Sequence, residues 1–142
     1  MIVPVQVLVD ADNLDVPRLR LLVAALDAAP TADVMVAGAP AALDAIDWPP
    51  RAQVVPASGW QGADLLLARA YHADDRPLLL ATGDGDFAQL ARRHPGSVLL
   101  VSGTSSRSRT LTGPRITPTD PAADGGAALR AWIAGWERAA ER

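Results

Sequence analysis

Aspartate residues follow two apolar, strand-like stretches of this sequence and open a helical one. They are Asp10 and Asp12 after residues 5–9, Asp64 at the start of residues 64–72, and Asp84 and Asp86 after residues 78–81. A single aspartate at the end of a strand is commonly a turn or cap residue, because its oxygens accept hydrogen bonds from free backbone N–H groups. Carboxylates from three separate segments that meet at one place would form an all-oxygen site, which suits Mg²⁺ or Mn²⁺ better than zinc.

Apolar runs alternate with alanine- and leucine-rich helical runs around these aspartates, which predicts an α/β fold with a mainly parallel sheet. The expected strands are residues 5–9, 33–37, 53–56, 78–81 and 98–101, and the expected helices are residues 16–29, 41–46, 64–72, 87–94 and about 125–140. The carboxyl ends of parallel strands share one edge of a sheet, and ligands bind there where the strand order reverses. We therefore expect Asp10, Asp64 and Asp84 to converge at that edge.

Such convergence has an electrostatic cost. Two carboxylates about 4 Å apart repel each other by roughly 4 kcal/mol at an effective dielectric constant near 20, which is a large fraction of the stability of a small domain. Helix N-termini at Asp64 and Asp86 would offset only about 0.3–1 kcal/mol each. A shared proton or a bound cation is therefore expected among these carboxylates.

The composition narrows the chemistry further. With 142 residues, of which 49% are hydrophobic, the chain is expected to form one domain. It has no cysteine, and all 13 basic residues are arginine, so thiolate zinc sites, cysteine nucleophiles and catalytic lysines are excluded. The net charge of −3 argues against coating nucleic acid through bulk positive charge, but not against holding it through metal ions and a local arginine patch. Without a run of roughly 18 apolar residues, the protein is expected to be cytoplasmic and to have no membrane contact.

Residues 103–121 form a connection of 19 residues before the final helix. This length is unusual inside a compact domain and indicates either a functional loop or a mobile one. Arg107, Arg109 and Arg115 could reach a phosphate backbone from this loop, or could be solvated side chains with no such role. The apolar face of the final helix, within residues 129–140, is expected to dock on the core and would also allow two chains to pair as a homodimer.

Three blocks of the sequence resemble the motifs of one known family. VLVDADNL at residues 7–14 ends a strand in Asp with Asn three residues later, GADLLLARA at residues 62–70 opens a helix with Gly-x-Asp, and LLLATGDGDFAQL at residues 78–90 has Thr before Gly-Asp-x-Asp-Phe. In this order and spacing, the blocks resemble the NYN domains, a branch of the PIN-like metal-dependent ribonucleases. The long loop and the final helix carry no motif of that family.

The resemblance implies a Rossmann-like, three-layer α/β/α sandwich in which residues 1–142 form a single PIN-like domain, with the motif-bearing core at about residues 5–101. It also implies hydrolysis of RNA phosphodiester bonds by a water molecule that bound Mg²⁺ or Mn²⁺ activates. The implied catalytic and metal-binding residues are Asp10, Asp64, Asp84 and Asp86. The residues expected on the substrate are Asn13, Thr82 and, from the long loop, Arg107 and Arg109.

Two positions depart from the family pattern, and two other functions stay open. Gln61 stands where many relatives carry a basic residue, which implies a weaker contact with phosphate. Ala70 stands where many carry another acid, which implies a metal site with fewer carboxylate ligands. The chain could therefore be an RNA-binding or protein-interaction module without turnover. The third alternative is a haloacid-dehalogenase-like phosphatase with Asp10 as its nucleophile. The absence of lysine argues against it, because those enzymes resemble one another in using a basic residue, usually lysine, in a further motif.

Overall fold

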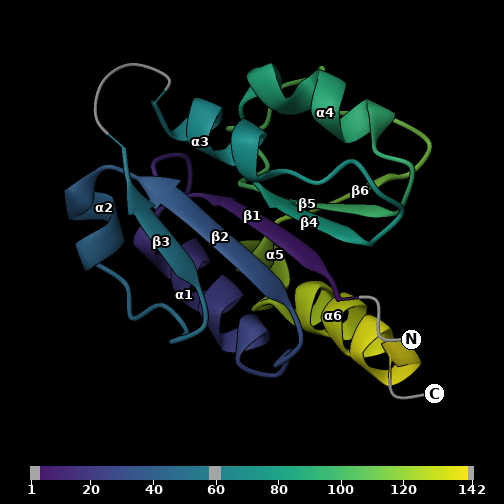
Figure 1. The fold of residues 1–142 in the computed structure, drawn as a ribbon, viewed down its shortest axis with the longest axis horizontal. Helices are drawn as coiled ribbons and strands as arrows, with labels where there is room; N and C mark the ends of the chain where they lie inside the picture. The colour runs from purple at the N-terminus through teal and green to yellow at the C-terminus, as the bar shows by residue number, and fades with distance from the viewer. Residues whose placement is uncertain (1–3, 58–61, 141–142) are drawn as a thin grey trace.

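One parallel sheet runs through residues 4–57 and 62–140, the part of the chain that the computed structural model describes (Figure 1). Its strands are β1 (Gln6–Asp10), β2 (Asp33–Gly38), β3 (Gln53–Pro56), β4 (Leu78–Ala81), β5 (Val98–Val101) and β6 (Ile116–Thr119). They lie in the order β3-β2-β1-β4-β5-β6, and every neighbouring pair is parallel. The predicted α/β fold with a mainly parallel sheet is confirmed.

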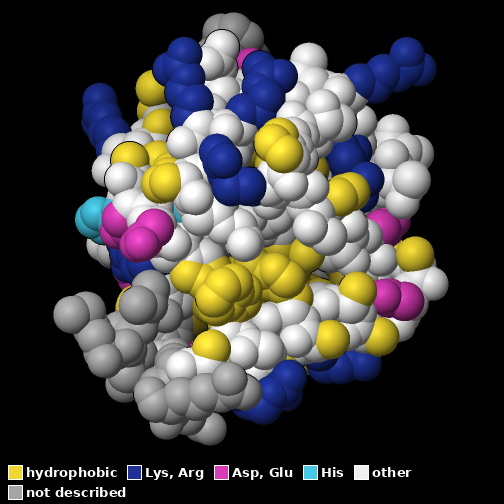
Figure 2. All heavy atoms as spheres, turned by 90° about the vertical axis from the view of Figure 1, so that its right-hand side faces the viewer, with side chains coloured by type: hydrophobic (Ala, Val, Ile, Leu, Met, Phe, Trp, Pro, Cys, Tyr) yellow, Lys and Arg dark blue, Asp and Glu magenta, His cyan; other side chains and the backbone are white. Residues whose placement is uncertain are grey.

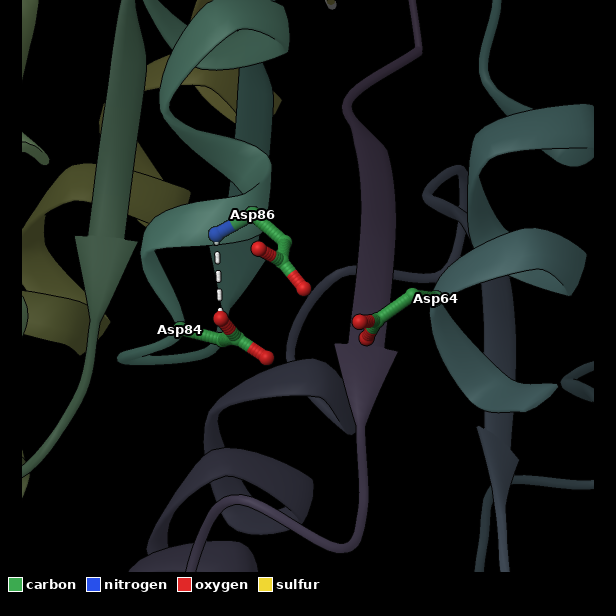
Figure 3. Close-up of side chains that lie close together, drawn as sticks. All are labelled: Asp64, Asp84 and Asp86. Atoms are coloured by element: carbon green, nitrogen blue, oxygen red, sulfur yellow. Dashed lines mark hydrogen bonds between the residues drawn. The ribbon is translucent and has the colours of Figure 1, made fainter. Parts of the chain in front are cut away.

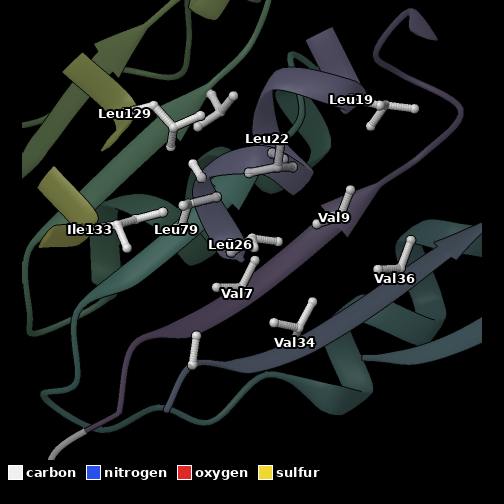
Figure 4. Close-up of a cluster of buried hydrophobic side chains, with 14 of the residues drawn as sticks. Val7, Val9, Leu19, Leu22, Leu26, Val34, Val36, Leu79, Leu129 and Ile133 are labelled. Carbon is white, nitrogen blue, oxygen red and sulfur yellow. The ribbon is translucent and has the colours of Figure 1, made fainter. Parts of the chain in front are cut away.

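Helices cover both faces of this sheet. They are α1 (Val16–Leu26), α2 (Pro40–Asp44), α3 (Gly62–Ala70), the 3₁₀-helix η1 (Gly85–Phe87), α4 (Ala88–Arg93), α5 (Pro121–Asp124) and α6 (Ala127–Ala140). On one face, side chains such as Val7 of β1, Leu22 of α1 and Leu129 of α6 form a single core (Figure 4). On the other face, Leu8 packs with Leu67 of α3 and with the η1 and α4 helices. These three layers are those of the predicted α/β/α sandwich.

Strand β1 shows how the sequence serves both cores. Successive side chains of a strand point to opposite faces, so Val7 and Val9 enter the core beneath α1 and α6, whereas Leu8 enters the core beneath α3. Asp10 has the same parity as Leu8 and therefore points to the face that carries α3. All five residues of β1 are buried, as expected for a central strand between two layers of helices.

The segment 103–121, predicted to be one long loop, contains regular structure. Residues 116–119 form the edge strand β6, which pairs only with β5 among the described strands, and α5 begins at Pro121. Pro118 obscured this strand in the sequence, because proline cannot donate a hydrogen bond to a sheet, yet an edge strand tolerates the missing N–H. The helix predicted over about residues 125–140 begins at Ala127. Gly125 and Gly126 separate it from α5 with φ angles of 65° and 85°, which glycine adopts at low cost.

The β6 edge of the molecule faces the viewer in Figure 2. Apolar side chains form a strip across the middle of this face, and several arginine side chains lie above it. Two half-buried tryptophans of α6, Trp132 and Trp136, pack edge to face with ring centroids 6.2 Å apart, which confirms that this helix docks on the core. Pairing of two chains through α6 stays a prediction.

Candidate metal centre

The strand order puts β1 and β4 side by side where the direction of winding reverses. From β1 the chain continues to β2 and β3 on one side, and from β4 it continues to β5 and β6 on the other. In open α/β sheets, ligands bind in the crevice outside the carboxyl ends of such a pair. Asp10 ends β1, and the turn that contains Asp84 and Asp86 follows β4. The structure therefore places these aspartates at the reversal of strand order, as predicted.

Asp10 is nearly enclosed by protein, with 4% of its surface exposed. Thr82, which is fully buried after β4, donates a hydrogen bond from Oγ1 to Asp10 Oδ2 over 3.2 Å. Burial withdraws water from the carboxylate and the charge of Asp64 repels it, so the pKa of Asp10 rises to about 6 although the bond from Thr82 opposes this change. Asp10 is thus a carboxylate whose negative charge the surrounding protein destabilises.

The turn after β4 is fixed by side chains from the first and third sequence blocks. The Oδ1 atom of Asn13 accepts a hydrogen bond from the Gly83 N–H over 2.6 Å, and Thr82 Oγ1 accepts one from the Asp84 N–H over 3.1 Å. Asp84 in turn caps η1, since its Oδ1 accepts a hydrogen bond from the Asp86 N–H over 3.0 Å. Asn13 and Thr82 therefore position the two acids of this turn.

Asp64, Asp84 and Asp86 form a group that we call the acid cluster (Figure 3). Asp64 lies in the first turn of α3, and one carboxylate oxygen of each residue lies within 4.8 Å of those of the other two. Figure 3 shows Asp64 facing Asp84 and Asp86 across the end of β1. Asp10 is not one of these three, although it is near enough to Asp64 for their charges to interact.

Protonation reduces the repulsion between the carboxylates of the acid cluster only at acidic pH. Burial raises the pKa of Asp64 to about 6, and the negative charges of Asp84 and Asp86 add to this effect. A hydrogen bond with the Asp86 side chain raises it as well, because only the protonated Asp64 carboxyl can donate a hydrogen bond to that neighbour. Below about pH 6 a shared proton therefore reduces the repulsion, and above that pH a cation would be needed to do so.

The donor set fits a divalent cation that prefers oxygen. Oxygens on opposite sides of one Mg²⁺ ion are about 4.2 Å apart, because each bond is about 2.1 Å long. Neighbouring oxygens of the same octahedral ion are about 3 Å apart. The three carboxylate oxygens, which lie within 4.8 Å of one another, would therefore have to move closer together to share one ion. Magnesium commonly keeps several water ligands, so three carboxylates are enough to hold it.

The arginine-bearing loop, residues 102–115, is docked on the turn of the acid cluster. The N–H of Ser108 donates a hydrogen bond to the carbonyl oxygen of Gly83 over 2.8 Å. A Cβ atom at Gly83 would lie 2.8 Å from the carbonyl oxygen of Ser106, and one at Gly85 would lie 2.8 Å from Ser108 Oγ. The two glycines of Gly-Asp-Gly-Asp are therefore places where the loop approaches the turn too closely for a side chain.

The arginines of this loop have different surroundings. Arg107 is half-buried, and its Nε donates a hydrogen bond to Ser102 Oγ over 2.8 Å, whereas Arg109 is exposed. Both flank Ser108, so the predicted substrate-binding pair lies on the loop that contacts the turn of the acid cluster. Arg115 instead donates from Nε to the carbonyl oxygen of His94 at the end of α4 over 3.0 Å, which is a structural role.

Other residues singled out in the sequence are not members of the acid cluster. Asp12 is exposed and accepts a hydrogen bond from the N–H of Ala39, the residue before α2, over 2.8 Å, and its charge contributes to the raised pKa of Asp10 and of Asp64. Ala70 ends α3 and lines a hollow with Gln6, which begins β1 at the opposite end of that strand from Asp10. Gln61 lies outside the described residues.

Sequence reasoning missed the ion pair of Arg18 and Asp120, which anchors the loop. The Nε and Nη2 atoms of Arg18 donate to the two carboxylate oxygens of Asp120 over 2.8 and 3.0 Å. Asp120 also accepts hydrogen bonds from the N–H and hydroxyl of Thr104 over 2.9 and 3.0 Å. The Arg18 guanidinium and these donors hold the pKa of Asp120 well below its usual range. The signal available in the sequence was weak: Asp120 precedes Pro121, as a helix cap often does.

Comparison with known proteins adds no family. No model of a known protein family matches the chain, and no curated protein matches it. None of the helices in the described part of the chain is long and apolar enough to cross a membrane. The structure thus shows a six-stranded parallel α/β fold with three clustered aspartates that could hold a divalent ion.

Proposed function

We propose that this chain is a divalent-metal-dependent ribonuclease of the NYN type, which hydrolyses RNA phosphodiester bonds. One observation carries the proposal: Asp64, Asp84 and Asp86 present oxygens within 4.8 Å of one another, beside the buried Asp10, where the strand order reverses. These four residues come from the three sequence blocks that resemble the NYN motifs.

The proposal assigns a different role to each group of side chains at the site. Asp10, Asp64, Asp84 and Asp86 are the proposed ligands of Mg²⁺ or Mn²⁺. Such an ion, when bound, lowers the pKa of a coordinated water and stabilises the leaving oxygen, so no protein nucleophile is required. Thr82 orients Asp10 through its hydroxyl. In the proposal, Arg109 on the docked loop contacts a phosphate of the RNA, which would fix the register of the strand.

Cleavage of a labelled single-stranded RNA in Mn²⁺ tests this proposal, with Asp84→Asn as the informative variant. An asparagine oxygen can still cap η1, so the variant should keep the fold while it loses one negative charge. We expect the wild type to cut the RNA in Mn²⁺ but not after EDTA has removed the metal. The variant should cut the RNA on the order of a hundredfold more slowly than the wild type. Asp27→Asn, at the exposed residue that follows α1 and whose charge is not among those acting on Asp10 or Asp64, is the matched control and should keep its activity. Cutting that persists in EDTA, or an Asp84→Asn variant as active as the wild type, would contradict the proposal.

A module that binds RNA without turnover is the second candidate. The observation in its favour is that Asp84 already serves as the cap of η1, so this acid has a structural use without any ion. In that case RNA would bind equally to the wild type and to Asp84→Asn, and neither would cut it. The phosphatase alternative is disfavoured, because its nucleophile would be Asp10, which is only 4% exposed.

A further inference from the structure

A groove opens beside the acid cluster, between α3 and the segment formed by η1 and α4. It has a volume of about 410 Å³. Asp64 and Asp86, which it shares with the acid cluster, line part of it, and Leu65, Ala68, Phe87, Gln89 and Leu90 line the remainder. Because the two carboxylates belong to both places, a molecule in the groove would reach the candidate metal centre without a gap.

The two ends of this groove differ in chemistry. Leu65 projects from α3 with 58% of its surface exposed, and it shares the groove with the half-buried Leu90 and the buried Phe87. A single exposed leucine is ordinary on a protein surface. This one, however, forms an apolar wall that continues directly into two carboxylates. The matching occupant has an apolar face next to an anionic group that a divalent ion can join to the carboxylates.

We propose that this groove holds one unpaired base of the RNA, next to the phosphate that lies at the acid cluster. Leu65 and Leu90 would contact the face of the base, and the exposed Gln89, which can both donate and accept hydrogen bonds, would contact its edge. The volume lies within the range of roughly 300–1,000 Å³ that is usual for small-molecule sites. This inference rests on the proposed ribonuclease function and adds a base-binding subsite to it.

The subsite has a consequence for the substrate. A base inside a duplex is stacked and paired, so its face cannot lie on Leu65 unless it leaves the helix. Contacts to the face of a base are tolerant of sequence, whereas contacts to its edge can discriminate. Leu65 therefore sets affinity for the unpaired base, and Gln89 sets which bases are preferred.

Binding of a short fluorescein-labelled single-stranded RNA, followed by fluorescence anisotropy, tests the subsite. Ca²⁺ replaces Mn²⁺ in this assay, because its looser coordination slows metal-assisted hydrolysis. Leu65→Ala should weaken binding by about five- to tenfold through lost apolar contact. Val54→Ala is the matched control: Val54 is also an exposed hydrophobic residue, at 37%, but it lies on β3 outside the groove. Its affinity for RNA should equal that of the wild type.

A series of RNAs, each with one base removed, completes the test. Removal of the base at one position should weaken binding to the wild type by at least the factor of Leu65→Ala, and should have a smaller effect in that variant, which has already lost one of the contacts to that base. Calorimetry should give Leu65→Ala the Mn²⁺ affinity of the wild type, which shows that the neighbouring Asp64 is undisturbed.

The possible failures are distinguishable. If Leu65→Ala binds RNA as tightly as the wild type, or if no single base matters, the groove has another occupant, such as a protein segment, and the subsite is refuted. Metal-dependent cutting by the wild type would then still support the proposed function. If the wild type neither binds nor cuts RNA, both proposals are wrong.

Discussion

Replacement of the buried Asp10 by asparagine should stabilise the metal-free protein at neutral pH, although it removes a proposed ligand. The pKa of Asp10 rises from 3.8 to about 6 on folding, chiefly through burial and the charge of Asp64. A carboxylate with a raised pKa destabilises the folded state wherever it is ionised. Asparagine carries no charge, and its oxygen can still accept the hydrogen bond from Thr82.

The magnitude follows from the change in proton affinity. A pKa that rises from 3.8 to about 6 corresponds to a loss of up to about 3 kcal/mol in the free energy of unfolding when Asp10 is ionised, because each factor of ten in proton affinity is worth about 1.4 kcal/mol. Below pH 3.8 both the folded and the unfolded chain carry the proton, so the cost is absent. It develops as the pH rises from 3.8 through 6 and is complete above that. Because Asp10 and Asp64 interact, the titration belongs to the pair.

Urea denaturation in EDTA, followed by tryptophan fluorescence, measures this effect at a series of pH values. The free energy of unfolding of Asp10→Asn minus that of the wild type should increase by up to about 3 kcal/mol between pH 4 and pH 8. Some acids, such as Asp74 and Asp120, have lowered pKa values, so their protonation in acid lowers the free energy of unfolding of both proteins. Comparing the two proteins at the same pH cancels this contribution. The same difference for Asp27→Asn, at the exposed residue after α1, should change much less with pH. A difference for Asp10→Asn that is independent of pH, or that shrinks as pH rises, would refute the reasoning.

Three further predictions concern the acid cluster and its supports. Mn²⁺ affinity, measured by calorimetry at pH 5 and pH 7.5, should be lower in acid, because the ion must displace a proton from Asp64 below about pH 6. In a urea titration, Gly83→Ala should lower the free energy of unfolding by about 1–3 kcal/mol, because the new methyl group would lie 2.8 Å from the Ser106 carbonyl oxygen. The control is Gly135→Ala, whose methyl group would have nothing within 4 Å. It should leave the free energy of unfolding unchanged or raise it by up to about 1 kcal/mol. Asp120→Ala should cost about 2–4 kcal/mol at pH 7, and the difference from the wild type should fall as the pH falls below 4, because the native pKa of this acid is lowered.

The convergence of the acids was predictable because it follows from topology. A parallel sheet brings the carboxyl ends of its strands to one edge, so Asp84 after β4 and Asp64 in the first turn of α3 were expected to approach each other if the strands were assigned correctly. The strand pattern of β1 also fixed the parity that points Asp10 toward α3.

The supports of the site were not predictable, because they depend on contacts between distant segments. Nothing local to Gly83 indicates that Ser108 will bind its carbonyl oxygen, and nothing local to Arg18 indicates that its partner is Asp120, 102 residues away. Strand β6 was missed because Pro118 suits a strand only at an edge, and strand order cannot be read from propensity. Asp12, which lies two residues from Asp10, binds the N–H of Ala39, a partner 27 residues away that nothing local to Asp12 indicates.

Calorimetric titration with Mn²⁺ at pH 7.5 and low salt tests the central claim most directly. We expect the wild type to bind Mn²⁺ and the control variant Asp27→Asn to bind it with similar affinity. Asp84→Asn, which keeps the cap of η1 but removes one charge from the acid cluster, should bind at least about tenfold more weakly. No binding by the wild type, or equal binding by Asp84→Asn, would mean that these aspartates serve only as caps and turns, and the claim of a metal centre would be wrong.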